Sequence, residues 1–111
     1  MICWDRVGRL REEVGAEDFL EVVDIFLEEV DEVIERLRQG GGAENLESEL
    51  HFLKGSALNL GFKALSELCA RGERLARENR LGEFDLDEVF STYDISMAEF
   101  MAGSAQRNFA A

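Results

Sequence analysis

The sequence predicts an all-α domain, an antiparallel up-down four-helix bundle with a short N-terminal covering helix. Three observations point to this fold class. Apolar residues recur at helical spacing in five segments, the chain contains no proline, and its strand-forming residues do not alternate. The 111 residues (1–111) make one domain of ordinary size, and the 46% of hydrophobic residues are enough to form a core.

The first two helices are separated by a glycine. A short helix is expected over 3–14, with Ile2 and Trp4 anchoring it on the bundle. A long helix is expected over 18–38, because apolar residues repeat there on one face. Its inner stripe consists of Phe19, Val23, Phe26, Val30, Val33 and Leu37. The run of glycines at 40–42 ends this helix.

The remaining helices are expected over 43–60, over 62–79 and from Asp85 onward. Gly61 is placed to cap the third helix in a left-handed conformation. Asp85, followed three residues later by a glutamate, resembles a capping box at the start of the fifth helix. Residues 103–111 are small and polar, and we expect this tail to fray. Short connections between long amphipathic helices favour antiparallel neighbours, and hence a bundle.

The charge of the chain excludes several partners. It has 24 Asp and Glu against 12 Lys and Arg, a net charge of −12. Phosphate backbones and anionic lipids repel such a chain, so we expect neither nucleic acid nor a membrane as partner. No apolar run is long enough to span a membrane, and the N-terminus lacks the plan of a signal peptide. Two isolated cysteines form neither a disulfide framework nor a zinc site, which favours a cytoplasmic setting.

His51 is the only histidine, and helical geometry turns it outward. At 100° per residue it lies roughly 140° from the centre of the apolar stripe of its helix. Lys54 and Gly55, three and four residues on, share its face, as does Leu58 one turn further. A glycine inside a helix costs roughly 1 kcal/mol relative to alanine, so Gly55 indicates a need for room beside the imidazole. On geometry alone, an idle surface histidine remains an alternative.

The stretch 51–62, HFLKGSALNLGF, resembles the signature of the histidine-containing phosphotransfer (HPt) domains of bacterial two-component phosphorelays. That signature reads His, any residue, an apolar residue, Lys, Gly, two small residues and, a few positions on, Leu-Gly. Every slot is filled here, although Ala57 stands where serine is frequent and the bulky Phe62 follows Gly61. The resemblance covers most of the chain, because the family fold is also a four-helix bundle with its histidine on the second long helix.

The resemblance implies a phosphotransfer protein. Neutral imidazole is a good nucleophile near pH 7, and His51 would accept a phosphoryl group from a receiver-domain phosphoaspartate on its outward Nε2 atom. It would then pass the group to the aspartate of another response regulator. Lys54 would steady the phosphoryl oxygens and Gly55 would make room. The protein would need no cofactor of its own, since the receiver would supply Mg²⁺. It would be a carrier and not an enzyme, because 111 residues leave no room for an ATP-binding kinase domain.

The expected partners are response-regulator receiver domains or a hybrid sensor histidine kinase, and the protein is expected to be a monomer. Contacts are expected at Leu58, at Glu47 one turn before His51, and at Ile25, which falls off the inner stripe of the second helix. Residues 54–80 carry six basic and three acidic side chains. This local excess suits the acidic phosphorylation pocket of a receiver, although the arginines equally suit a solvated helix face.

Two alternatives stay open. A helical adaptor would bind a receiver or another protein without phosphotransfer. The bundle could also belong to a larger hybrid kinase, although the Met1 start and the short tail favour a free-standing protein. A Glu-rich bundle can hold a di-iron site, but that site needs two Glu-x-x-His motifs and the chain has one histidine. No metal ligand set is therefore expected.

Overall fold

The computed structural model describes residues 1–41 and 43–106. They form the helices α1 (Trp4–Val14), α2 (Phe19–Arg38), α3 (Leu46–Leu60), α4 (Lys63–Arg77) and α5 (Leu86–Gln106). Short 3-10 turns, η1 (Ala43–Asn45) and η2 (Leu81–Glu83), precede α3 and α5. The cap expected at Asp85 is present, since its Oδ1 atom accepts a hydrogen bond from the Asp87 N–H at 2.9 Å. All five helices predicted from the sequence are confirmed to within a few residues.

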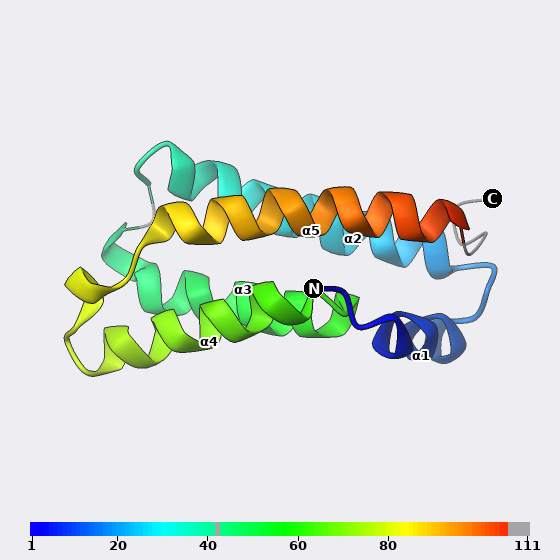
Figure 1. Cartoon of the computed structure of the whole chain (residues 1–111), viewed down its shortest axis with the longest axis horizontal. Helices are drawn as coiled ribbons and strands as arrows, with labels where there is room; N and C mark the ends of the chain where they lie inside the picture. The colour runs from blue at the N-terminus through cyan, green and yellow to red at the C-terminus, as the bar shows by residue number, and fades with distance from the viewer. Residues whose placement is uncertain (42, 107–111) are drawn as a thin grey trace.

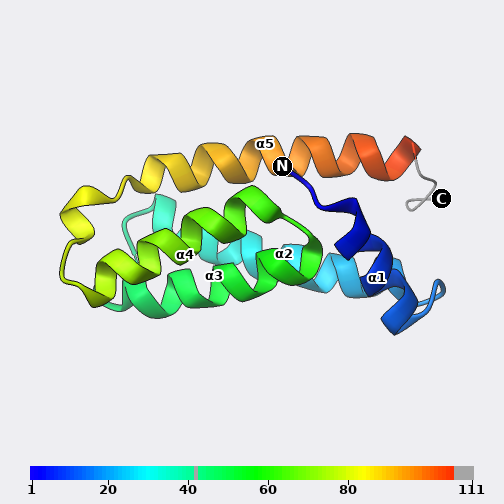
Figure 2. The same cartoon turned by 60° about the horizontal axis from the view of Figure 1, so that its bottom comes forward.

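Helices α2 to α5 run side by side along the long axis of the molecule, and each is antiparallel to the one before it (Figures 1 and 2). Helix α1 lies across one end of this arrangement. The molecule is elongated, with extents of 43 × 23 × 19 Å. The predicted up-down four-helix bundle with an N-terminal covering helix is therefore confirmed.

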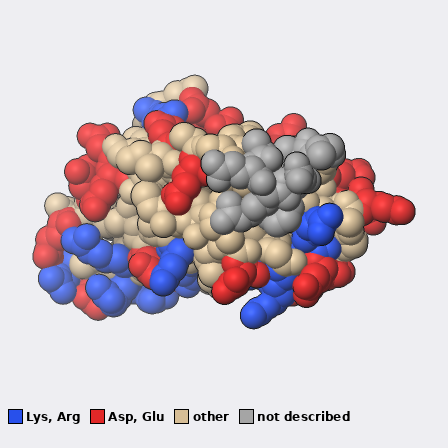
Figure 3. Space-filling model, turned by 45° about the vertical axis from the view of Figure 1, so that its right-hand side comes forward, with Lys and Arg blue, Asp and Glu red and all other residues tan. Residues whose placement is uncertain are grey.

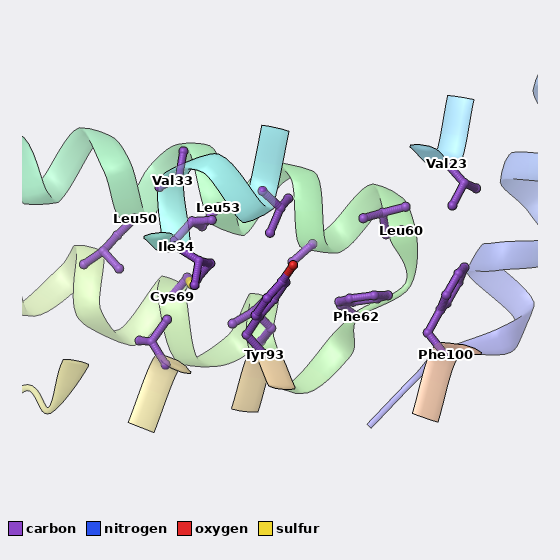
Figure 4. Close-up of a cluster of buried hydrophobic side chains, with 14 of the residues drawn as sticks. Val23, Val33, Ile34, Leu50, Leu53, Leu60, Phe62, Cys69, Tyr93 and Phe100 are labelled. Atoms are coloured by element: carbon purple, nitrogen blue, oxygen red, sulfur yellow. The ribbon is translucent and has the colours of Figure 1, made fainter. Parts of the chain in front are cut away.

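The core follows the axis of the bundle, and every helix contributes one stripe to it (Figure 4). On α3 the stripe includes Leu50 and Leu53, which are fully buried. They face Ile34 from α2 and Tyr93 from α5 in the middle of the bundle. Apolar burial is the main favourable term in folding, at about 25 cal/mol per Å². Because this stripe of α3 is buried in the core, the opposite face of the helix, which carries His51, lies at the surface.

The turn between α3 and α4 requires a glycine. Gly61 has a φ of 79°, in the left-handed region, and caps α3 as predicted. The N-terminal segment crosses the chain at this turn, because the Cys3 N–H donates to the Gly61 carbonyl at 2.6 Å and Ile2 pairs with Phe62 in an isolated antiparallel bridge. A Cβ atom on Gly61 would come within 2.6 Å of the Cys3 carbonyl oxygen. This close approach fixes the start of α1 against the end of α3.

The prediction that residues 103–111 fray is wrong for the first part of this segment, because α5 continues through Gln106. The physical reason is a contact from the other end of the chain. Trp4 stacks on Phe100, with ring centroids 5.8 Å apart. Its indole ring also lies so close to Gly103 that a Cβ atom there would clash with it. The last five residues of the predicted tail lie outside the described residues.

Candidate functional site

His51 lies on the outer face of α3, as its helical position predicts. Its side chain is 69% exposed. The imidazole leans toward α4, where its Nδ1 atom lies 3.0 Å from the Oε1 atom of Glu73. The ring is therefore both accessible to another molecule and fixed on one side by a partner within the chain.

Glu73 is the residue that organises this site, and the sequence analysis did not single it out. Its side chain is only 6% exposed, and a buried carboxylate is costly unless it is paired. Three side chains pair with it. The Nδ1 atom of His51 and the Nη1 atom of Arg77 lie 3.0 and 2.9 Å from Oε1, and the Nζ atom of Lys54 lies 2.7 Å from Oε2. Glu73 follows the buried Cys69 by four residues, which places it on the inner edge of α4.

The charge of Glu73 follows from these contacts. The Lys54 ammonium, and after it the hydrogen bond with His51, lower the pKa of Glu73, whereas burial acts in the opposite direction. The carboxylate is therefore ionised at neutral pH and serves as an acceptor. An acceptor at Nδ1 assigns the proton of the neutral imidazole to that atom. The Nε2 atom, on the other side of the ring, then keeps its lone pair.

Lys54 is held close to the imidazole, but its contact with Glu73 is less directional than the others. The side chain is 32% exposed, and its contact with Oε2 is an ion pair that lacks the geometry of a hydrogen bond. Oε1, by contrast, is hydrogen-bonded to His51 and Arg77. Because Arg77 pairs with the same carboxylate, Lys54 can turn toward an anion on the imidazole while the charge of Glu73 stays compensated.

Gly55 and Leu58 share the face of His51, as predicted. A Cβ atom on Gly55 would meet no described atom within 4 Å, so packing inside the protein does not require this glycine. Leu58 is 61% exposed and adds apolar area further along the same face. The structure thus brings these two residues and Lys54 to one surface around the imidazole, while their roles toward a partner stay predictions.

The other two predicted partner contacts lie apart from each other. Glu47 is exposed and lies one turn before His51 on α3. Ile25 is 50% exposed but belongs to α2, and no described contact brings it to the imidazole. Phe52, which the sequence analysis did not name, is 39% exposed beside a groove of about 280 Å³ between α2 and α3. Its position off the apolar stripe of α3 is the feature of the sequence that could have predicted its exposure.

Basic side chains gather toward the end of α4, at the lower left of the view in Figure 3. The exposed members are Arg71, Arg74, Arg77 and Arg80. Arg77 pairs with Glu73, and Arg80 pairs with two further glutamates. Arg74 forms no ion pair within the described part of the chain. The local excess of positive charge predicted from the sequence therefore lies at the surface, next to the histidine site.

Neither Cys69 nor a cluster of carboxylates offers a second reactive centre in the part of the chain that is described. Burial, with a further contribution from the charge of Glu73, raises the pKa of Cys69 to about 12, so this thiol is unreactive at neutral pH. No three His, Cys, Asp or Glu side chains among residues 1–41 and 43–106 come together as a metal site. None of the described helices has the length and apolar character needed to cross a membrane.

Comparisons with known proteins agree with this geometry. The family model described as "Hpt domain" matches residues 21–98. The "Phosphorelay intermediate protein YPD1" of Candida albicans is 30% identical over 80 residues, which are 69% of this chain and 44% of that protein. The chain therefore spans less than half the length of this relative. Because the relative is fungal, the resemblance to bacterial domains concerns the type of domain and not the organism. No solved structure matches the chain significantly. Since the family model covers well over half of the residues, the chain belongs to the Hpt domain family, that of the histidine phosphotransfer proteins.

Proposed function

We propose that this protein is a phosphocarrier in which His51 accepts a phosphoryl group from the phosphoaspartate of a receiver domain and passes it to the aspartate of another response regulator. The observation that carries the proposal is the contact of His51 with Glu73, because a ring bonded through Nδ1 at 3.0 Å presents Nε2 to a partner. Membership of the Hpt domain family and similarity to a phosphorelay intermediate protein support the same function.

The transfer can be written atom by atom. The lone pair of Nε2 attacks the phosphorus of the acyl phosphate, the bond from phosphorus to the aspartyl oxygen breaks, and the carboxylate leaves. The product is an N–P bond at Nε2 of His51, and the ring now carries a positive charge. Its Nδ1–H continues to donate to the carboxylate of Glu73, which stabilises this charge. Attack by the carboxylate of the next receiver reverses the step and returns the neutral imidazole.

Other residues of the site have supporting roles in this proposal. Lys54 turns from Oε2 of Glu73 toward the phosphoryl oxygens, where a charge-assisted hydrogen bond forms. The open space at Gly55 admits the loops of the receiver around the phosphoryl group. Mg²⁺ bound by the receiver offsets the charge of the phosphoryl oxygens. The chain contributes no cofactor of its own.

The same proposal includes the location, the oligomeric state and the partners of the protein. It acts in the cytoplasm as a monomeric carrier without kinase activity of its own, and it meets receiver domains or a hybrid sensor kinase. Glu47 and Leu58 contact the receiver, with Ile25 at the margin of the contact. Arg74, which has no ion-pair partner among the described residues, supports a receiver as partner, because the phosphorylation pocket of a receiver is acidic. The net charge of −12 argues against nucleic acid and anionic membranes.

The test is phosphoryl transfer from a panel of phosphorylated receiver domains, with His51→Gln as the matched variant. We expect an acid-labile, base-stable label on the wild type alone, and equal helical content of both proteins by circular dichroism. A label on His51→Gln would contradict the assignment of the site. Binding of a receiver without any label on the wild type would instead favour an adaptor that does not transfer phosphoryl groups.

A further inference from the structure

The transfer chemistry at His51 does not use a groove beside Leu58. The groove has a volume of about 320 Å³ and a mostly apolar lining. Its lining residues are Cys3, Arg6, Leu58, Gly61, Lys63, Ser66 and Glu67. They come from the start of α1, the end of α3 and the start of α4, which are the three segments that meet at the turn of Gly61.

The groove and His51 lie on the same side of α3. Leu58 follows His51 by two helical turns, which corresponds to about 10 Å along the axis and a rotation of only about 20°. Gly55 lies between them and carries no side chain, and Lys54, the other residue of this face, extends toward Glu73 on α4. Leu58 is also the most exposed large apolar side chain among the described residues, at 61%. A molecule that reaches Nε2 can therefore cover Leu58 as well.

Two cationic side chains, Lys63 and Arg6, lie at the rim of the groove, although the chain as a whole is acidic. Lys63 is exposed and forms no ion pair within the described part of the chain. The guanidinium group of Arg6 is held at the rim by Asn59 and Glu13, at 3.0 and 3.1 Å. Glu67 is the one acidic residue of the lining. An occupant that fits this rim combines a large apolar side chain with neighbouring carboxylates.

We propose that the groove seats a large apolar side chain of the receiver domain that exchanges a phosphoryl group with His51, and that acidic residues beside that side chain pair with Lys63 and Arg6. This inference rests on the proposed function and adds to it the anchoring point and the charge of the docking segment. A receiver is the occupant to which the geometry points, because its phosphorylation pocket must reach Nε2, two helical turns away. A second copy of this chain fits less well, since two chains of net charge −12 repel each other.

The test compares Leu58→Ala and Lys63→Glu with a matched control, Ile95→Ala. Ile95 is 55% exposed and belongs to α5, away from the groove. Two quantities are measured with the receiver that transfers fastest in the panel. One is the Kd of the unphosphorylated receiver, obtained by calorimetry. The other is the rate of transfer from the receiver divided by the rate of labelling with phosphoramidate, a small donor that needs no docking surface.

We expect Leu58→Ala to weaken receiver binding about tenfold and to lower the ratio of the two rates by a similar factor. Lys63→Glu should weaken binding more at low than at high ionic strength, because the rim charges are exposed and therefore screened by salt. Ile95→Ala should leave both quantities at their wild-type values. In a ¹⁵N-edited titration, the amide signals of Cys3, Gly61 and Lys63 should shift when the receiver is added.

Wild-type affinity in both groove variants, or signal shifts confined to α2 and α5, would overturn the inference. A concentration-dependent dimer in sedimentation that Leu58→Ala dissociates would also overturn it, because a second copy would then occupy the groove. Failure of the proposed function gives a different result. In that case neither phosphoramidate nor any receiver labels wild-type His51, whatever the residue at position 58.

Discussion

An exposed imidazole on α3 is held by a buried carboxylate on α4, because the Nδ1 atom of His51 lies 3.0 Å from Oε1 of Glu73. The exposed fractions of the two side chains are 69% and 6%. One nitrogen of the ring is thus anchored at the edge of the protein interior while the other faces solvent. Holding a nucleophile in a fixed orientation before the reaction lowers the entropic part of the barrier. The pair of helices, and not the partner, sets the direction of Nε2.

Removing the carboxylate at position 73 is expected to disorder the imidazole. Glu73→Ala takes away the acceptor of the Nδ1–H and leaves two cations uncompensated, so we expect phosphoryl transfer to slow at least about tenfold, the equivalent of about 1.4 kcal/mol. Glu73→Gln keeps an acceptor oxygen, so its transfer rate should lie between those of the wild type and Glu73→Ala. The ¹⁵N chemical shifts of the His51 ring should report the Nδ1–H tautomer in the wild type and a mixture in Glu73→Ala. Equal tautomer populations in both would remove Glu73 from the positioning of the ring.

Lys54 and Arg77 pair with the same carboxylate, and their substitution should separate two effects. Lys54→Ala is expected to raise the pKa of Glu73, because the Lys54 ammonium is the largest cause of its lowering. It should also slow transfer, because the phosphoryl oxygens lose a cation. Arg77→Ala removes an ion pair with Glu73 and should slow transfer less. Carboxyl ¹³C titration and single-turnover kinetics measure the two effects. Slower transfer in Arg77→Ala than in Lys54→Ala would assign the phosphoryl contact to the arginine.

The stability of the protein should depend on pH through Glu73. Its pKa in the folded state is lowered from the ordinary value, so the ionised form favours folding. This contribution is fully present above the pKa of the unfolded chain, about 4.3 for a glutamate, and is lost as the pH falls through the lower folded value. Urea unfolding at a series of pH values should show a smaller loss of stability on acidification for Glu73→Gln than for the wild type. The prediction fails if the two pH dependences coincide.

Gly55→Ala should change stability and partner binding in opposite directions. Alanine is the better helix former by about 1 kcal/mol, and its Cβ atom meets no described neighbour, so the free energy of unfolding should rise. The same methyl group occupies the space beside the imidazole, so transfer from a receiver should slow, and Gly55→Leu should slow it further. Gly8→Ala on α1 is the matched control, because a Cβ atom there also meets open space. It should raise stability without changing transfer. A faster or unchanged transfer in Gly55→Leu would place the docking surface elsewhere.

Gly103→Ala should lower stability although alanine favours a helix. The added Cβ atom would clash with the indole of Trp4, and overpacking of this kind costs about 1–3 kcal/mol. Trp4 is the only tryptophan of the chain, so its fluorescence reports directly on this contact. We expect a lower midpoint of thermal unfolding and a red-shifted emission. A midpoint equal to or above that of the wild type would mean that the ring can move aside without cost.

The orientation of individual helices could be predicted from the sequence, because it depends on the periodicity of one segment. This is why the outward positions of His51, Gly55 and Leu58 were found. Glu73 was missed, since a glutamate among arginines is typical of a solvated helix face. Its contact with His51 depends on the register of α4 against α3, which many packing interactions determine together. The available signal was its spacing of four residues from Cys69, on the buried edge of the helix.

The extension of α5 to Gln106 was not predicted for a related reason. Gly103 belongs to a segment of small and polar residues, which is typical of a chain terminus. The helix continues there because the indole ring of Trp4, almost a hundred residues earlier in the sequence, packs against this glycine. The sequence around Gly103 does not indicate a contact with a residue so distant in the chain.

The packing of Trp4 on the last turns of α5 links the start of the chain and the end of α5 to one wall of the groove, because Cys3 and Arg6 flank this tryptophan. The pair formed by His51 and Glu73 lies entirely on α3 and α4 and does not depend on that wall. If the groove seats the receiver as proposed, substitutions at Cys3 or Arg6 are therefore expected to change receiver binding while labelling of His51 by a small donor is preserved.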